Sequence, residues 1–120
     1  MMPHESIGQS VFGGAFTTPL MFLKDTAISN NVERMSRYVQ DRDVSIAPHV
    51  KTAMAPALFA RQLDAGAWAL TAATVSQARV LHEHGVKRIL LANQLVDPAA
   101  IRWVANKLAD SRFEFMFFID

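Results

Sequence analysis

The residues with the clearest chemical potential are a histidine and a lysine two positions apart, His49 and Lys51. They close the segment 44–51, which we expect to be a β-strand. Because successive side chains of a strand point to opposite faces, His49 and Lys51 would share a face and Val50 would point the other way. Packed among apolar neighbours, Lys51 would be desolvated, which favours the neutral amine that attacks a carbonyl. The alternative is that Lys51 leaves the strand into water, the usual environment of a lysine at a strand end.

Other polar residues also lie at the ends of predicted strands. Thr52 comes directly after Lys51, and Asn93 and Gln94 end a later predicted strand. His82 and His84 are two apart on a predicted helix, so they do not share a face, and we expect both to be solvated rather than to bind a metal. The sequence contains no cysteine and no glycine-rich phosphate-binding motif, and we predict no metal site.

Composition and charge narrow the function classes. The chain has 120 residues, of which 51% are hydrophobic, and its formal net charge is +1. This balance predicts a globular protein that binds neither nucleic acid nor a membrane surface. No signal peptide or membrane-spanning run is visible, so we expect a cytoplasmic protein.

Strands and helices alternate along the chain. Residues 1–18 are expected to form a flexible leader, and residues 19–120 a partial barrel domain in the order βαβαβαβαβ. Four helix starts are predicted. Ser29 and Asp97 are expected N-caps, a proline marks the starts at Pro56 and after Asp97, and Thr74 begins a Thr–Gln capping box. The predicted strands are 20–24, 44–51, 67–73, 88–94 and 113–119.

This alternation predicts an α/β fold with a parallel sheet covered by helices. Two architectures fit it. A flavodoxin-like doubly wound sheet has about this length, whereas a TIM barrel has the same local pattern and needs ~250 residues.

The stretch Ala47-Pro-His-Val-Lys-Thr52 resembles the P-H-x-K-T motif of the D-threonine aldolase and D-serine dehydratase group. These enzymes use pyridoxal 5'-phosphate (PLP) and are related to the N-terminal domain of alanine racemase. The similarity continues through residues 54–68, 71–78 and 89–96 and extends over most of 18–120. It implies an alanine-racemase-like TIM barrel, of which this chain would be the N-terminal half.

The resemblance also implies roles for the candidate site residues. Lys51 would bind PLP covalently and transfer protons, and His49 would tune Lys51 or contact the cofactor ring. Thr52, Asn93 and Gln94 would be further cofactor contacts. The substrate would be a small D-amino acid, and the full-length relative would be a homodimer. A metal would be bound only in a C-terminal region beyond this chain.

The flanks of the motif differ from much of the family. Ala47 precedes it where relatives have arginine, and Ala53 and Met54 follow where they have histidine and lysine. We therefore expect a D-serine dehydratase or deaminase type of β-elimination, with D-threonine aldolase cleavage as the alternative. A PLP carrier without catalysis and a non-enzymatic flavodoxin-like module are further alternatives. We expect the 120-residue chain to be a truncated product that is inactive alone.

Overall fold

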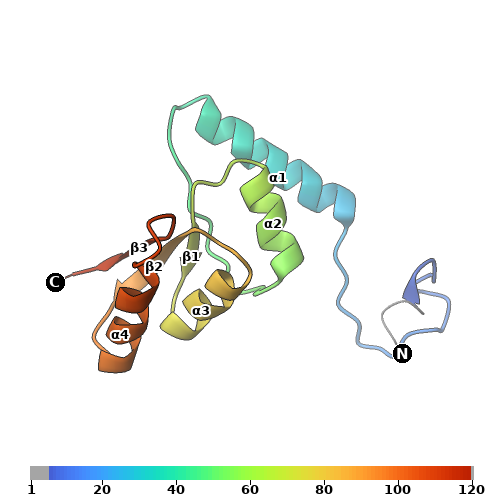
Figure 1. The fold of residues 1–120 in the computed structure, drawn as a ribbon. Coiled ribbons are helices and arrows are strands. Elements are labelled where there is room, and N and C mark those ends of the chain that lie inside the picture. Colours follow the sequence, from blue (N-terminus) through green and yellow to red (C-terminus); the bar gives the residue numbers. More distant parts are fainter. Residues whose placement is uncertain (1–5, 120) are drawn as a thin grey trace.

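The computed structural model describes residues 6–119, so the first five residues of the predicted leader lie outside the description. Helices and strands alternate from the middle of the chain onward (Figure 1). In chain order the elements are α1 (Asp25–Gln40), α2 (Pro56–Asp64), β1 (Leu70–Ala72), α3 (Val75–Glu83), β2 (Arg88–Gln94), α4 (Pro98–Lys107) and β3 (Glu114–Phe118).

The strands form one parallel sheet in the order β1-β2-β3. The segment 46–50 lies beside β1, held by an isolated parallel bridge between His49 and Thr71. Four stretches of chain therefore lie side by side in sequence order. A flavodoxin-like sheet reverses its strand order part-way along the chain, whereas a barrel continues in sequence order. The order favours the barrel.

The predicted strand 44–51 forms only this bridge, so the expectation of a full strand is wrong. Pro48 explains the difference. Its carbonyl accepts from Thr71 N–H, and Val50 N–H donates to the carbonyl of Thr71, so the backbone of Pro48 faces β1. A proline nitrogen has no hydrogen to donate, so the ladder is broken at this position.

The predicted strand 20–24 is also wrong. Residues 20–24 form no strand, and Met21 is 90% exposed. Within the described residues no neighbouring strand lies beside this segment, and a strand needs a ladder partner to satisfy its backbone groups. Figure 1 shows that the chain before α1 runs away from the body of the molecule.

Three of the four predicted helix starts are confirmed. Pro56 and Pro98 each occupy the first turn of a helix, and Thr74 caps α3 by accepting from Gln77 N–H. Ser29 is not a cap, because α1 already begins at Asp25, whose carboxylate suits the positive end of the helix dipole. Among the described helices, none is long and apolar enough to cross a membrane.

The core lies between the sheet and its helices. Val50, Leu70, Ala72 and Ile89 pack in one cluster with Phe59 of α2 and with Ala78 and Leu81 of α3. The side of the sheet on which these strand residues lie is therefore the side that faces the helices. On the opposite side the register aligns His49, Thr71, Leu90 and Met116 in one row.

Candidate functional site at the carboxyl edge of the sheet

Lys51 lies in a turn that is anchored on both sides. Before it, Val50 is buried in the core, and after it, the half-buried side chain of Met54 packs against the same cluster. Met54 N–H donates to the carbonyl of Val50 at 2.9 Å and closes the turn. Met54 has a φ of +43°, which is strained for a residue with a side chain. The backbone of Lys51 is therefore held in one place at the end of its segment.

His49 is held by a network centred on Thr71 of β1. Thr71 N–H donates to the carbonyl of Pro48 at 2.8 Å, and Val50 N–H donates to the carbonyl of Thr71 at 3.0 Å. The Thr71 hydroxyl donates to the carbonyl of Ala47 at 2.6 Å, and Thr71 is only 3% exposed. Thr71 is thus a positioning residue that was missing from the predicted site. Its signal in the sequence was a hydroxyl inside an otherwise apolar strand.

The expected burial of Lys51 is wrong. Lys51 is exposed, as are His49 and Thr52, because no described residue covers the carboxyl edge of the sheet above them. Val50 is 5% exposed and packs in the core, whereas its neighbours His49 and Lys51 are exposed. Within residues 6–119, no ion pair or hydrogen bond involves the Lys51 amine.

Asn93 and Gln94 reach the same edge of the sheet but are not in contact with Lys51. They end β2, which is separated from the Lys51 segment by β1, so the separation is roughly 10 Å at the usual spacing of strands. Both residues are exposed, and the Asn93 side chain accepts from Gln94 N–H at 2.9 Å. They line a pocket of about 200 Å³ with Thr74 and Asp97. A single bound molecule would have to span this distance to contact both Lys51 and the Asn93–Gln94 pair.

The two histidines of α3 have different environments, and one expectation about them is wrong. His82 is half-buried, with its ring 4.8 Å from that of Phe113 and 5.8 Å from that of Trp103. Burial lowers the pKa of His82, and nearby Lys107 and Lys87 lower it further. His84 is exposed, as expected, and its Nδ1 lies 2.9 Å from the carbonyl of Val80.

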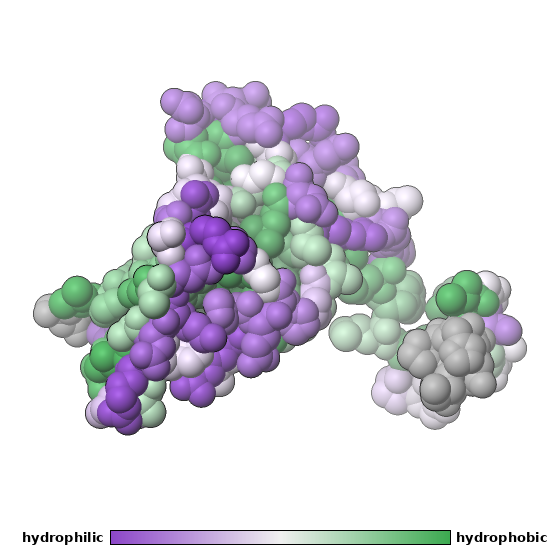
Figure 2. Space-filling model, viewed as in Figure 1, coloured by the Kyte–Doolittle hydropathy of each residue, from purple (hydrophilic) through white to green (hydrophobic). Residues whose placement is uncertain are grey.

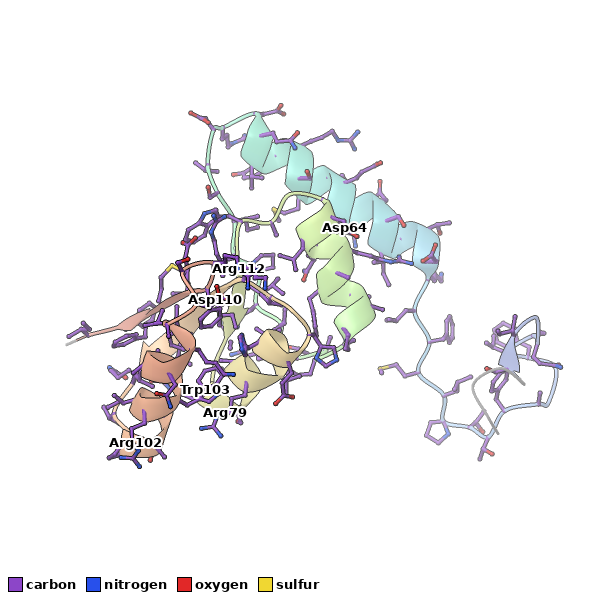
Figure 3. The ribbon with its side chains drawn as sticks, viewed as in Figure 1. Asp64, Arg79, Arg102, Trp103, Asp110 and Arg112 are labelled. Atoms are coloured by element: carbon purple, nitrogen blue, oxygen red, sulfur yellow. The ribbon has the colours of Figure 1, made fainter. Side chains whose placement is uncertain are left out.

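The charged residues around α4 serve structure rather than the site. The guanidinium of Arg79 lies 5.3 Å from the centre of the Trp103 ring, so α3 and α4 are joined by a cation–π contact (Figure 3). Hydrogen bonds from Arg112 to the Asp110 carboxylate lower the pKa of Asp110 to about 2. No cluster of three or more metal-ligating side chains is present between residues 6 and 119.

Comparison with known proteins gives a consistent group of relatives. A D-threonine aldolase from Arthrobacter sp. is 30% identical over 84 residues, which is 70% of this chain and 22% of that protein. The D-threonine aldolase structure from Filomicrobium marinum has a TM-score of 0.79 and 26% identity, covering 87% of this chain and 28% of that one. The predicted resemblance is confirmed. No protein-family model matches the chain.

A dehydratase has the same fold. D-threo-3-hydroxyaspartate dehydratase from Delftia sp. HT23 has a TM-score of 0.75 and 25% identity, covering 88% of this chain and 27% of its own. The α/β fold with parallel strands is therefore that of the alanine-racemase-like barrels, and the flavodoxin-like alternative is wrong. The chain spans about a quarter of the length of these relatives.

The residues at the carboxyl edge fit one end of PLP. Covalent attachment to the cofactor's aldehyde needs a primary amine that is accessible and not engaged by a carboxylate, and Lys51 meets both conditions among the described residues. His49, two residues before Lys51, is also exposed and offers a ring that can stack or accept a proton. The open edge above them leaves room for a ligand.

Proposed function

We propose that this chain supplies the cofactor lysine, Lys51, of a PLP-dependent lyase acting on D-amino acids. The observation that carries the proposal is the anchored turn 50–54, which holds a lysine without an ion-pair partner among residues 6–119 at the carboxyl edge of a barrel-type parallel sheet. In parallel α/β folds the reactive groups gather at this edge. The similarity to D-threonine aldolases and to D-threo-3-hydroxyaspartate dehydratase supports the same reaction class.

The substrate class follows from the names of these relatives. D-threonine and D-threo-3-hydroxyaspartate are both D-amino acids with a hydroxyl group on the β-carbon. We therefore propose a small β-hydroxy D-amino acid as the substrate, with D-serine as the first choice.

The mechanism assigns each residue of the edge a task. PLP, when bound, supplies an electron sink for the bonds at the substrate α-carbon. Lys51 would hold the cofactor, and its amine would move a proton at the substrate α-carbon. His49, two residues before Lys51, would orient the ring. Thr52, Asn93 and Gln94 would supply polar contacts to the cofactor from the carboxyl ends of the 46–50 segment and of β2.

Two reactions compete for such a substrate. Loss of the β-hydroxyl converts D-serine, with water adding later, to pyruvate and ammonia, whereas cleavage of the Cα–Cβ bond converts D-threonine to glycine and acetaldehyde. Ala47, Ala53 and Met54 around the lysine motif favour elimination, because much of the aldolase group has basic and imidazole groups there. The aldolase relatives favour cleavage as the second candidate.

Binding is tested by titrating the purified chain with PLP and following the cofactor's absorbance. We expect a saturable change in the absorbance for the wild type and for Lys87→Ala. This control removes an exposed lysine that directly precedes β2, at the amino ends of the strands. We expect no such change in Lys51→Ala. A change that persists undiminished in Lys51→Ala overturns the assignment.

Turnover is tested with PLP and D-serine or D-threonine. We propose that the chain alone is inactive, because its site is open to water above Lys51. Turnover by the isolated chain would contradict this part of the proposal. The product would then separate the reactions, since pyruvate indicates elimination and acetaldehyde indicates cleavage.

A further inference from the structure

The turn that carries Lys51 ends on a strained residue. Met54 has a φ of +43°, in the left-handed region that side chains disfavour. Where φ is positive after α2 and after α3, the chain has glycine, at Gly66 and Gly85. Among residues 6–119, the one other residue with a side chain and a positive φ is Asp43. A long apolar side chain at position 54 therefore needs a reason of its own.

Asp43 and Met54 meet the same backbone requirement in different surroundings. Aspartate is one of the few residues that adopt this conformation readily. Asp43 is exposed in the turn 41–43, and Figure 2 shows hydrophilic surface over the end of α1, where this turn lies. Met54 is half-buried and packs against the core cluster. The contact of its side chain, rather than the ease of its backbone, thus suits methionine to position 54.

The chain reverses from the sheet into α2 at Met54, because the next residue cannot provide the reversal. Pro56 restricts the residue before it to extended backbone, and Ala55 has a φ of −106° and a ψ of +112°. Met54 N–H closes the turn on the carbonyl of Val50 at 2.9 Å. Val50 is buried at one end of the turn, Met54 packs at the other, and the residues 51–53 between them are exposed.

We propose that Met54 is a positioning residue that fixes Lys51 for attachment of PLP. This inference rests on the proposed function, in which the Lys51 amine and the cofactor aldehyde form a C=N bond and release water. Glycine at position 54 would relieve the strain but would leave the turn free to move. The packed methionine side chain keeps one conformation despite the strain, as at many functional sites. A lysine held in this way loses less conformational freedom when its amine bonds to a ligand.

The first test measures the turn without PLP. Amide hydrogen exchange at residue 54, corrected for the intrinsic rate of each residue type, should be about fivefold faster in Met54→Gly than in the wild type. Met54→Leu keeps an apolar side chain and should exchange as slowly as the wild type. Asp43→Gly is the matched control, because it introduces glycine at the other position of this kind, and it should leave the exchange at residue 54 unchanged. Equal exchange in Met54→Gly and the wild type overturns the inference.

The second test measures the choice among lysines. Substoichiometric PLP is added, borohydride reduces the C=N bonds that have formed, and mass spectrometry locates the label. Met54→Gly should lower the share of label on Lys51, relative to the other lysines, by about threefold. Met54→Leu and Asp43→Gly should keep the wild-type share. Undiminished preference for Lys51 in Met54→Gly overturns the inference.

A core variant separates positioning from general loss of stability. Val86 is 3% exposed in the core cluster and precedes β2, so Val86→Ala destabilises the fold outside the turn. Circular dichroism establishes that each variant is folded during labelling. Val86→Ala should keep the preference for Lys51, and an equal loss of preference in Val86→Ala and Met54→Gly would overturn the role of Met54. Wild-type label that avoids Lys51 contradicts the proposed function and the cofactor role of Met54 together, whereas the exchange experiment reports on the turn alone.

Discussion

At the scale of single residues, one hydroxyl fixes the chain that presents His49 and Lys51. The Thr71 hydroxyl is buried and donates to the carbonyl of Ala47. Thr71→Val keeps the shape and leaves that carbonyl without its donor, so we expect a loss of about 1–2 kcal/mol in the free energy of unfolding. Urea unfolding measures the loss. Thr71→Ser should restore most of it, and equal stability of Thr71→Val and wild type would contradict the assigned role.

His82 makes stability depend on pH. Its folded pKa lies below the ordinary value of 6.5, because burial against Phe113 and Trp103 disfavours the charged ring. The unfolded chain therefore binds a proton more readily, and stability that is fully present above about pH 6.5 is lost as the pH falls toward the folded pKa.

Urea midpoints between pH 7.5 and 5 measure this dependence. His82→Phe keeps an aromatic ring and cannot titrate, so we expect it to reduce the acid loss. His84→Gln, at the exposed histidine of the same helix, should leave the loss unchanged. An identical acid loss in wild type and His82→Phe would show that His82 is not its source.

The sequence was informative about where the site residues lie and less so about their surroundings. The period of a strand correctly predicted that Val50 points away from its two neighbours, since Val50 is buried while His49 and Lys51 are exposed. The exposure of Lys51 could not be predicted, because the burial of a side chain depends on which residues, distant in sequence, pack over it. The packing of His82 was missed for a similar reason, since Trp103 and Phe113 are distant in sequence.

At the scale of elements, the helix caps are the best determined features. Asp97 Oδ1 accepts from Ala100 N–H at 2.7 Å at the start of α4. Asp97→Ala removes this bond and should lower the free energy of unfolding by about 1 kcal/mol, with Asp97→Asn as the control that retains a cap. Thermal unfolding measures both. Equal destabilisation by the two variants would indicate that charge, rather than capping, matters at this position.

Local signals explain which elements were predicted. Caps and first-turn prolines act within a few residues, so the starts of α2, α3 and α4 were predicted correctly. Strands depend on partners that are distant in sequence. The apolar run 20–24 has no strand beside it among the described residues, and Pro48 reduces the 44–51 strand to one bridge.

At the scale of the whole molecule, strand order carried the information that composition lacked. The alternation of strands and helices predicted an α/β fold but allowed two architectures. The sequential order of β1, β2 and β3, together with the similar folds of two lyases, selects the barrel. Sequence periodicity does not encode the order of strands, which is why the residues alone left this choice open.

The central claim is that Lys51 is the lysine that holds the cofactor. The most direct measurement is borohydride reduction of the chain with substoichiometric PLP, followed by mass spectrometry of its peptides. The chain carries three other lysines, Lys24, Lys87 and Lys107, which serve as internal controls. We predict that the label concentrates on the peptide containing Lys51. Label spread equally over the four lysines, or concentrated on another of them, would contradict the account.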